Sequence, residues 1–160
     1  ALDYSVIRLN ERAVNAGMDL PRVRGAEGTT LTITGTAEPV TGAPVCKTGQ
    51  SSTFTCGFVS ADHVETQLFT AEGVSKTIRG FANSACTLGG DSGGAIVSGT
   101  LALGITSGSN AADAPNCAEA NTQLAPYGGT ASLGIPIRPI LADAAGAIGG
   151  ITVRTKPNAG

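Results

Sequence analysis

The sequence is poor in charged and aromatic side chains, and these shortages exclude several classes of protein. Only 14% of its 160 residues are charged, 4% are aromatic, and tryptophan is absent. A formal net charge of −2 gives no electrostatic reason to expect nucleic acid as a partner. No apolar run approaches the roughly 18 residues that a membrane span needs, so we expect no membrane partner.

Metal ligands are equally scarce. The chain has one histidine, His63, without neighbouring ligands, and its cysteines lack the C-x-x-C spacing of a zinc site. We therefore expect no metal and no cofactor. No signal-peptide pattern opens the chain, so we expect any export signal to lie upstream or to have been removed.

Four cysteines allow three disulfide pairings. Cys46 and Cys56 bracket a polar, turn-rich segment, whereas Cys86 and Cys117 flank the most glycine-rich stretch. The non-overlapping pairs Cys46–Cys56 and Cys86–Cys117 are the economical arrangement, and they would indicate an oxidising compartment outside the cytosol. The alternative is four buried free thiols in a cytosolic protein.

Short β-rich runs recur between turn clusters and predict an all-β fold, either a sandwich or a barrel. A helix is expected over 139–148, where apolar residues recur at helical spacing before two glycines. Residues 10–26 show no clear period and are expected to link two structural units. The predicted strands are 4–9, 29–35, 54–59, 64–69, 94–97, 101–106 and 151–154.

The strongest chemical signal is Gly90-Asp91-Ser92-Gly93-Gly94. A serine hydroxyl becomes an effective nucleophile only when a base takes its proton and donors receive the oxyanion. Glycines beside the serine let the backbone bend so that amide N–H groups converge. The alternative is a glycine-rich hairpin with a chance serine.

Further short segments accompany this motif along almost the whole chain. Cys86 lies six residues before Ser92, and LGITSG follows over 103–108. The other segments are residues 3–7 (DYSVI), 20–23 (LPRV), 45–49 (VCKTG), 55–57 (TCG) and 138–141 (RPIL). Together with the motif, they resemble the α-lytic protease and streptogrisin group, secreted bacterial members of the chymotrypsin-like serine peptidase family.

The resemblance implies chymotrypsin-like antiparallel β-barrels, with the second barrel complete, the first largely missing, and a C-terminal helix. Residues 1–26 would be the end of the first barrel and the inter-barrel linker. Residues 27–160 would form the second barrel with the nucleophile, the substrate pocket and the helix. The same two disulfides are implied.

In catalysis, the resemblance makes Ser92 the nucleophile and Asp3 the carboxylate that orients a histidine. By position alone, Asp3 would be a solvated terminal carboxylate. The N–H groups of Gly90 and Ser92 would receive the oxyanion, and Ser107 would support Asp3. The backbone of residues 107–109 would pair with a polypeptide substrate as an added strand.

The catalytic histidine of this family lies tens of residues before the aspartate, and this chain starts two residues before Asp3. We therefore expect an upstream segment of the same protein to carry the base. His63 is expected to be an exposed hairpin residue, not the base.

Asp91 poses a second question, because a buried carboxylate needs a cation or a proton. In bacterial relatives an arginine supplies the cation, but the matching position here is Thr34. The candidate partners are Arg22, Arg24 and Arg79, or a new amino terminus made by processing upstream.

The pocket for the residue before the scissile bond would have no acidic lining, which argues against Lys or Arg at that position. Ala85 and Thr106 are small, and Thr106 stands where glutamate-specific relatives carry histidine, so a medium to large apolar side chain is expected. Ser109 replaces the usual glycine and would narrow the mouth. The lining expected from the resemblance is Ser84, Ala85, Thr106, Ser107, Gly108, Ser109 and residues 132–134.

The expected function is therefore a secreted serine endopeptidase that forms an acyl-enzyme on Ser92. The alternative is a non-catalytic, peptide-binding pseudoprotease of the same fold. The intact glycine-rich motif favours the enzyme, because a binding module needs no oxyanion donors. An esterase of another fold is disfavoured, since no strand–helix alternation is present.

Overall fold

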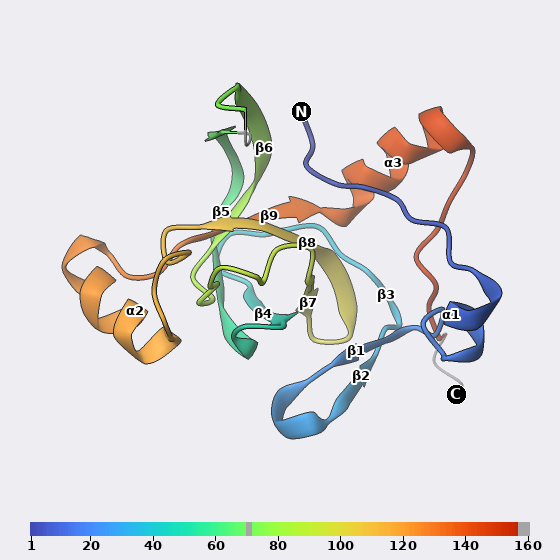
Figure 1. Cartoon of the computed structure of the whole chain (residues 1–160), viewed down its shortest axis with the longest axis horizontal. Coiled ribbons are helices and arrows are strands. Elements are labelled where there is room, and N and C mark those ends of the chain that lie inside the picture. Colours follow the sequence, from blue (N-terminus) through green and yellow to red (C-terminus); the bar gives the residue numbers. More distant parts are fainter. Residues whose placement is uncertain (70–71, 157–160) are drawn as a thin grey trace.

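A closed antiparallel barrel forms the centre of the protein in a computed structural model that describes residues 1–69 and 72–156 (Figure 1). The strands follow the order β3-β8-β7-β4-β5-β6-β9, and an additional pairing of β8 with β9 closes the ring. Six strands make the barrel, and β3 pairs with β8 in parallel at its edge. They are β4 (Pro44–Gly49), β5 (Thr53–Phe69), β6 (Ser75–Asn83), β7 (Ala95–Ser98), β8 (Leu101–Ser109) and β9 (Ser132–Pro136).

The barrel interior is filled by one apolar cluster from alternate positions of its strands. Phe81 is fully buried at its centre, and a Cβ added to Gly134 would lie 2.5 Å from the Phe81 ring. Glycine on β9 therefore makes room for the only aromatic residue of this cluster. The cluster consists of Val45, Val59, Phe81, Ile96 and Leu103.

A second apolar cluster covers the outside of the barrel below α3 (Ile137–Ile148). The amino-terminal segment contributes Leu2 and Tyr4 to it, and in Figure 1 this segment runs along α3. Burial of these side chains fixes the position of a segment that has no secondary structure of its own. The buried members are Ile78, Leu133, Ile135 and Ile140.

The remaining elements lie around the barrel. A third cluster, with Cys86 and Leu88, packs under α2 (Cys117–Leu124), which stands on the opposite side of the barrel from α3 (Figure 1). The short strands β1 and β2 pair with each other, and the two-residue strand β3 pairs with β8. These elements are α1 (Glu11–Asn15), β1 (Arg22–Arg24), β2 (Thr30–Thr32), β3 (Gly35–Thr36), and the 3-10 turns Ala26–Gly28 and Ala125–Tyr127.

The structure confirms the predicted fold class, an antiparallel β-barrel with a C-terminal helix. The predicted strands at 4–9 and 151–154 are wrong, because neither segment has strand pairing. The two strands predicted at 54–59 and 64–69 form the single strand β5, whose register shifts between Val59 and Val64. A bulge, rather than a turn, therefore accounts for the irregular pattern there.

No helix within residues 1–69 and 72–156 is long and apolar enough to cross a membrane.

Candidate active site

Ser92 lies on a tight turn between β6 and β7, with its side chain exposed. The turn is tied down by backbone bonds on its carboxyl side. Gly93 donates to the Thr106 carbonyl at 2.8 Å, and Gly94 donates to the Asp91 carbonyl at 3.1 Å. Gly93 has a φ of 86°, a conformation that favours glycine. The sequence Asp-Ser-Gly-Gly thus presents a serine hydroxyl to the surface.

Ser107 connects Ser92 with Asp3, two residues that are far apart in the sequence. The Ser92 hydroxyl donates to the carbonyl oxygen of Ser107 at 3.2 Å. The Ser107 hydroxyl in turn donates to Asp3 Oδ2 at 2.5 Å. The structure therefore brings Ser92, Ser107 and Asp3 together, which agrees with the positions expected from the resemblance.

The backbone before Ser92 carries two N–H groups without protein acceptors. Within the described residues, neither Gly90 nor Ser92 donates its backbone N–H to another protein group. Gly90 has a φ of 96°, and a Cβ added there would lie 2.5 Å from the Ser51 hydroxyl. Only glycine therefore fits at this position, and both amides are available to a ligand.

The partner of Asp91 is Lys47 on β4, and the predicted candidates Arg22, Arg24 and Arg79 are wrong. Lys47 Nζ lies 3.2 Å from Asp91 Oδ2, and the side chains are 1% and 0% exposed. The prediction failed because Lys47 follows Cys46 in a strand that was not predicted. Its inward direction, shared with Val45 two residues before, is the sequence signal that was missed.

Hydrogen bonds complete the environment of the Asp91 carboxylate. It accepts backbone N–H bonds from Leu88 at 2.8 Å, Ser51 at 2.9 Å and Ser52 at 3.0 Å. Burial alone would raise the pKa of Asp91, but the bonds from Leu88, Ser52 and Ser51 outweigh it and lower that pKa to about 2. Burial lowers the pKa of Lys47, although Asp91 opposes this shift. Asp91 thus remains ionised and fixes the loop that leads to Ser92.

The predicted substrate-binding residues divide into two groups. Ala85 and Thr106 are buried, at 0% and 2% exposure, so neither forms an open surface. Gly108 and Ser109 instead line a pocket of about 350 Å³. No charged side chain is among its lining residues, which also include Val64, Thr66, Ala82, Asn110, Ala131, Ser132 and Leu133.

The strand beside Ser92 has an open edge. The last pairing of β8 with β7 joins Ile105 to Ala95, and Thr106 then bonds to the Ser92 turn. Beyond this point, β8 pairs only with β9 among the described strands. Residues 107–109 therefore offer backbone groups to an added strand.

Two disulfides are present, Cys46–Cys56 and Cys86–Cys117, the pairs that the spacing favours. The first joins neighbouring positions of β4 and β5. The second links Cys86, six residues before Ser92, to the first residue of α2. It therefore crosslinks the loop that carries the serine to the segment that follows β8.

His63 lies apart from this arrangement. It is exposed on β5 and lines a pocket of about 250 Å³ with Pro39, Pro136 and Arg138. None of the residues that line this pocket belongs to the Ser92–Ser107–Asp3 connection. In residues 1–69 and 72–156, no group of three or more His, Cys, Asp or Glu side chains is placed to hold a metal ion.

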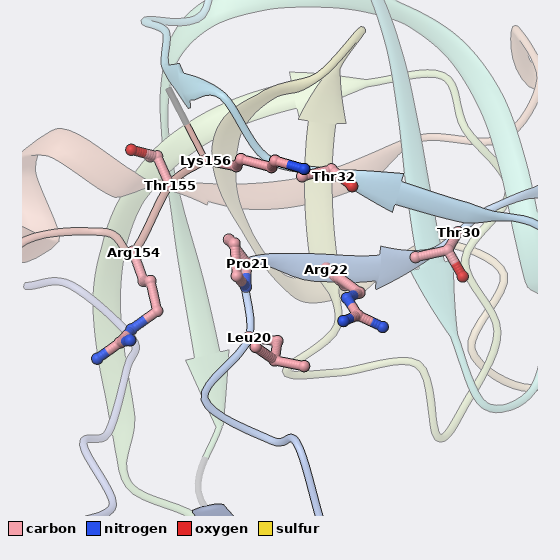
Figure 2. Close-up of a pocket in the computed structure, with 8 residues that line it drawn as sticks. All are labelled: Leu20, Pro21, Arg22, Thr30, Thr32, Arg154, Thr155 and Lys156. Atoms are coloured by element: carbon pink, nitrogen blue, oxygen red, sulfur yellow. The ribbon is translucent and has the colours of Figure 1, made fainter. Parts of the chain in front are cut away.

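A larger pocket, of about 590 Å³, lies between β1, β2 and the carboxyl-terminal segment (Figure 2). Three of its lining residues are basic, namely Arg22, Arg154 and Lys156. Figure 2 shows their charged ends pointing in different directions, and Arg154 pairs with Asp19 at 3.7 Å. The pocket contains none of the predicted site residues and presents no convergent anion site.

Comparisons with known proteins agree with this geometry. Residues 1–128 match the trypsin family. The chain is 44% identical over 85 residues to serine protease 1 of Rarobacter faecitabidus, covering 53% of this chain and 15% of that protein. It is 35% identical over 109 residues to glutamyl endopeptidase 2 of Streptomyces griseus, covering 68% of this chain and 53% of that protein.

Solved structures give the same result. Protease A of Thermobifida fusca matches with a TM-score of 0.58 and 31% identity, over 78% of this chain and 58% of that one. A chymotrypsin of Cellulomonas bogoriensis matches with a TM-score of 0.60 and 28% identity, over 79% of this chain and 60% of that one. The chain spans no more than about half the length of the curated relatives named above. With four fifths of its residues matched, the chain belongs to the trypsin family of chymotrypsin-like serine peptidases.

Proposed function

We propose that this protein is a serine endopeptidase that cleaves polypeptides through an acyl-enzyme on Ser92. The observation that carries this proposal is the connection from Ser92 through Ser107 to Asp3. Ser92 Oγ attacks the scissile carbonyl carbon while its proton passes to a base. The N–H groups of Gly90 and Ser92 stabilise the oxyanion, the amine leaves with a proton, and water then releases the acyl group.

The base is a histidine supplied by a segment of the same protein outside residues 1–160. Two observations support this part of the proposal. The one histidine of the chain, His63, lines a pocket that lacks Ser92 and Asp3. Asp3 has one oxygen bonded to Ser107, and an imidazole N–H held by the other would acquire the tautomer that a general base needs.

The substrate binds as an added strand on residues 107–109 of β8. The open edge of this strand supports the proposal, since an extended peptide pairs with such an edge through its backbone. A medium to large apolar residue precedes the scissile bond. The uncharged pocket beside Gly108 and Ser109, with Val64 and Leu133 in its lining, suits such a side chain.

The protein acts outside the cytosol. Both disulfides support this, because such bonds persist in oxidising compartments and are rare in the cytosol.

One observation favours a second candidate, a peptide-binding pseudoprotease. The open β8 edge would bind a peptide without any base, and Ser92 has no histidine in contact among the described residues. The available amides of Gly90 and Ser92 weigh against this candidate, because peptide binding alone does not require them.

The test is cleavage of an extended peptide with Phe or Leu before the scissile bond. We expect negligible turnover by residues 1–160 alone and turnover when the upstream segment is supplied, lost again in Ser92→Ala. Robust turnover by residues 1–160 alone, abolished by His63→Ala, would overturn the assignment of the base. Peptide binding without cleavage in the whole protein would favour the pseudoprotease.

A further inference from the structure

The segment that carries Asp3 is attached to the barrel at a few points. Ala1 forms two backbone bonds with β6, donating to Thr77 and accepting from Arg79. Ser107 binds one oxygen of the Asp3 carboxylate. Residues 5–9 are exposed and have no strand pairing. The orientation of Asp3 therefore depends on how its neighbours are fixed.

Tyr4, the residue after Asp3, makes the attachment on the carboxyl side. Its hydroxyl donates to Asp143 Oδ2 on α3 at 2.6 Å, across 139 positions of the sequence. Its ring packs on the outer apolar cluster with Ile135 and Ile140. The hydrogen bond to Asp143 raises the pKa of Tyr4 above its ordinary value of 10.

Asp143 has no other hydrogen bond or ion pair within the described residues. It is exposed on α3, so the fold does not require a carboxylate there. A short bond to an ionised acceptor is stronger than a neutral one. The contact thus joins the C-terminal helix to the residue next to Asp3.

From this contact we infer that Asp143 and Tyr4 are positioning residues for Asp3, an inference that rests on the proposed peptidase function. Ser107 fixes only one oxygen of Asp3, and the carboxylate can still swing about that bond when the backbone shifts. The Tyr4–Asp143 bond restricts this shift and keeps the second oxygen directed at the base. Small misplacements of catalytic groups lower the rate steeply, whereas substrate binding on β8 is not affected.

The experiment compares Tyr4→Phe, Asp143→Leu and Asp143→Asn in the protein that carries its base. Tyr4→Phe and Asp143→Leu each lose the hydrogen bond, so we expect kcat to fall about five-fold with KM unchanged. Asp143→Asn keeps an acceptor oxygen and should restore kcat to within about two-fold. The double variant Tyr4→Phe/Asp143→Leu should be no worse than either single one. Asp113→Leu, an exposed carboxylate before α2, is the matched control and should change nothing.

A second readout does not need activity. Hydrogen exchange of the Arg79 amide, which donates to the Ala1 carbonyl, should be faster in Tyr4→Phe and Asp143→Leu, and near the parent rate in Asp143→Asn. Unchanged kcat and unchanged exchange in both bond-deleting variants would overturn the inference, as would losses that add in the double variant. An inactive parent protein with a normal exchange response would instead overturn the proposed function and leave the contact itself supported.

Discussion

Lys47 and Asp91 form an ion pair at 3.2 Å with both side chains removed from solvent. The pair joins β4 to the loop directly before Ser92, and Lys47 also donates to the Ser52 hydroxyl. Burying two charges is costly, and the cost is offset only when hydrogen bonds satisfy the remaining polar atoms. The three N–H groups on Asp91 meet this condition. The conformation of the serine turn therefore depends on a lysine 45 positions before Ser92.

Replacing this lysine should be strongly destabilising. Lys47→Met leaves Asp91 buried without a cation, and we expect the free energy of unfolding to fall by about 3–5 kcal/mol. The double variant Lys47→Met/Asp91→Asn removes the uncompensated charge and should recover part of the loss. Urea denaturation of all three proteins measures both effects. A loss below about 1 kcal/mol in Lys47→Met would contradict the importance of the pair.

The low pKa of Asp91 predicts acid sensitivity in a defined window. Its folded pKa is about 2, against an ordinary value of 3.8. Between these values the unfolded chain binds more protons, so stability falls as pH falls from about 4 to about 2. The loss should reach roughly 2 kcal/mol. Denaturation curves across this range should show a weaker pH dependence in Asp91→Asn, and an identical slope in that variant would count against the assignment.

Gly90 should tolerate no side chain. An alanine at position 90 would be strained at a φ of 96°, and its Cβ would contact the Ser51 hydroxyl. The loop would therefore shift and displace an oxyanion donor. We expect kcat of the complete protein to fall on the order of 10²-fold. Gly99→Ala is the matched control, because Gly99 has a φ of 61° with open space around it. Gly99→Ala should cost some stability but leave kcat unchanged. Equal kcat values for Gly90→Ala and Gly99→Ala would refute the role of Gly90 in positioning the oxyanion donor.

The two disulfides should differ in their contribution. The Cys86–Cys117 bond closes a longer loop, with a separation of 31 residues against 10 for Cys46–Cys56. Chain-entropy arguments then give about 4 kcal/mol for the longer loop and about 3 kcal/mol for the shorter one. Paired Cys→Ala variants measured by denaturation test this order. Only loss of the Cys86–Cys117 disulfide should also slow the reaction at Ser92, because only this disulfide is attached to the loop that carries Ser92.

The strand patterns predicted an all-β fold, and the resemblance around the glycine-rich motif implied the barrel. The alternation of apolar residues locates β7 and β8, and the periodicity at residues 139–148 locates α3. The predictions of strands at 4–9 and 151–154 were wrong because neither segment pairs with a neighbouring strand. In the first segment, Val6 and Ile7 are exposed, at 53% and 80%. Apolar content alone does not distinguish a paired strand from an unpaired segment at the surface.

The contacts of the site join residues that are far apart in the sequence, and no local sequence pattern predicts such contacts. From the sequence alone, a lysine is expected at the surface. In β4, however, Lys47 is two residues from Val45 and therefore lies on the same, buried side of the strand. The bond of Tyr4 to Asp143 joins residues near the two ends of the described chain, and Asp143 belongs to no motif that would pair it with Tyr4. Side chains that meet through the closed barrel therefore require the structure.

The central claim is that Ser92 is the nucleophile, and covalent labelling tests it most directly. The complete protein, with its upstream segment, is treated with a fluorophosphonate, and the modified residue is located by mass spectrometry. The account predicts a single label on Ser92, no label on the Ser92→Ala variant, and a loss of kcat on the order of 10³-fold or more in that variant. A label on another serine, with peptidase activity retained in Ser92→Ala, would contradict it.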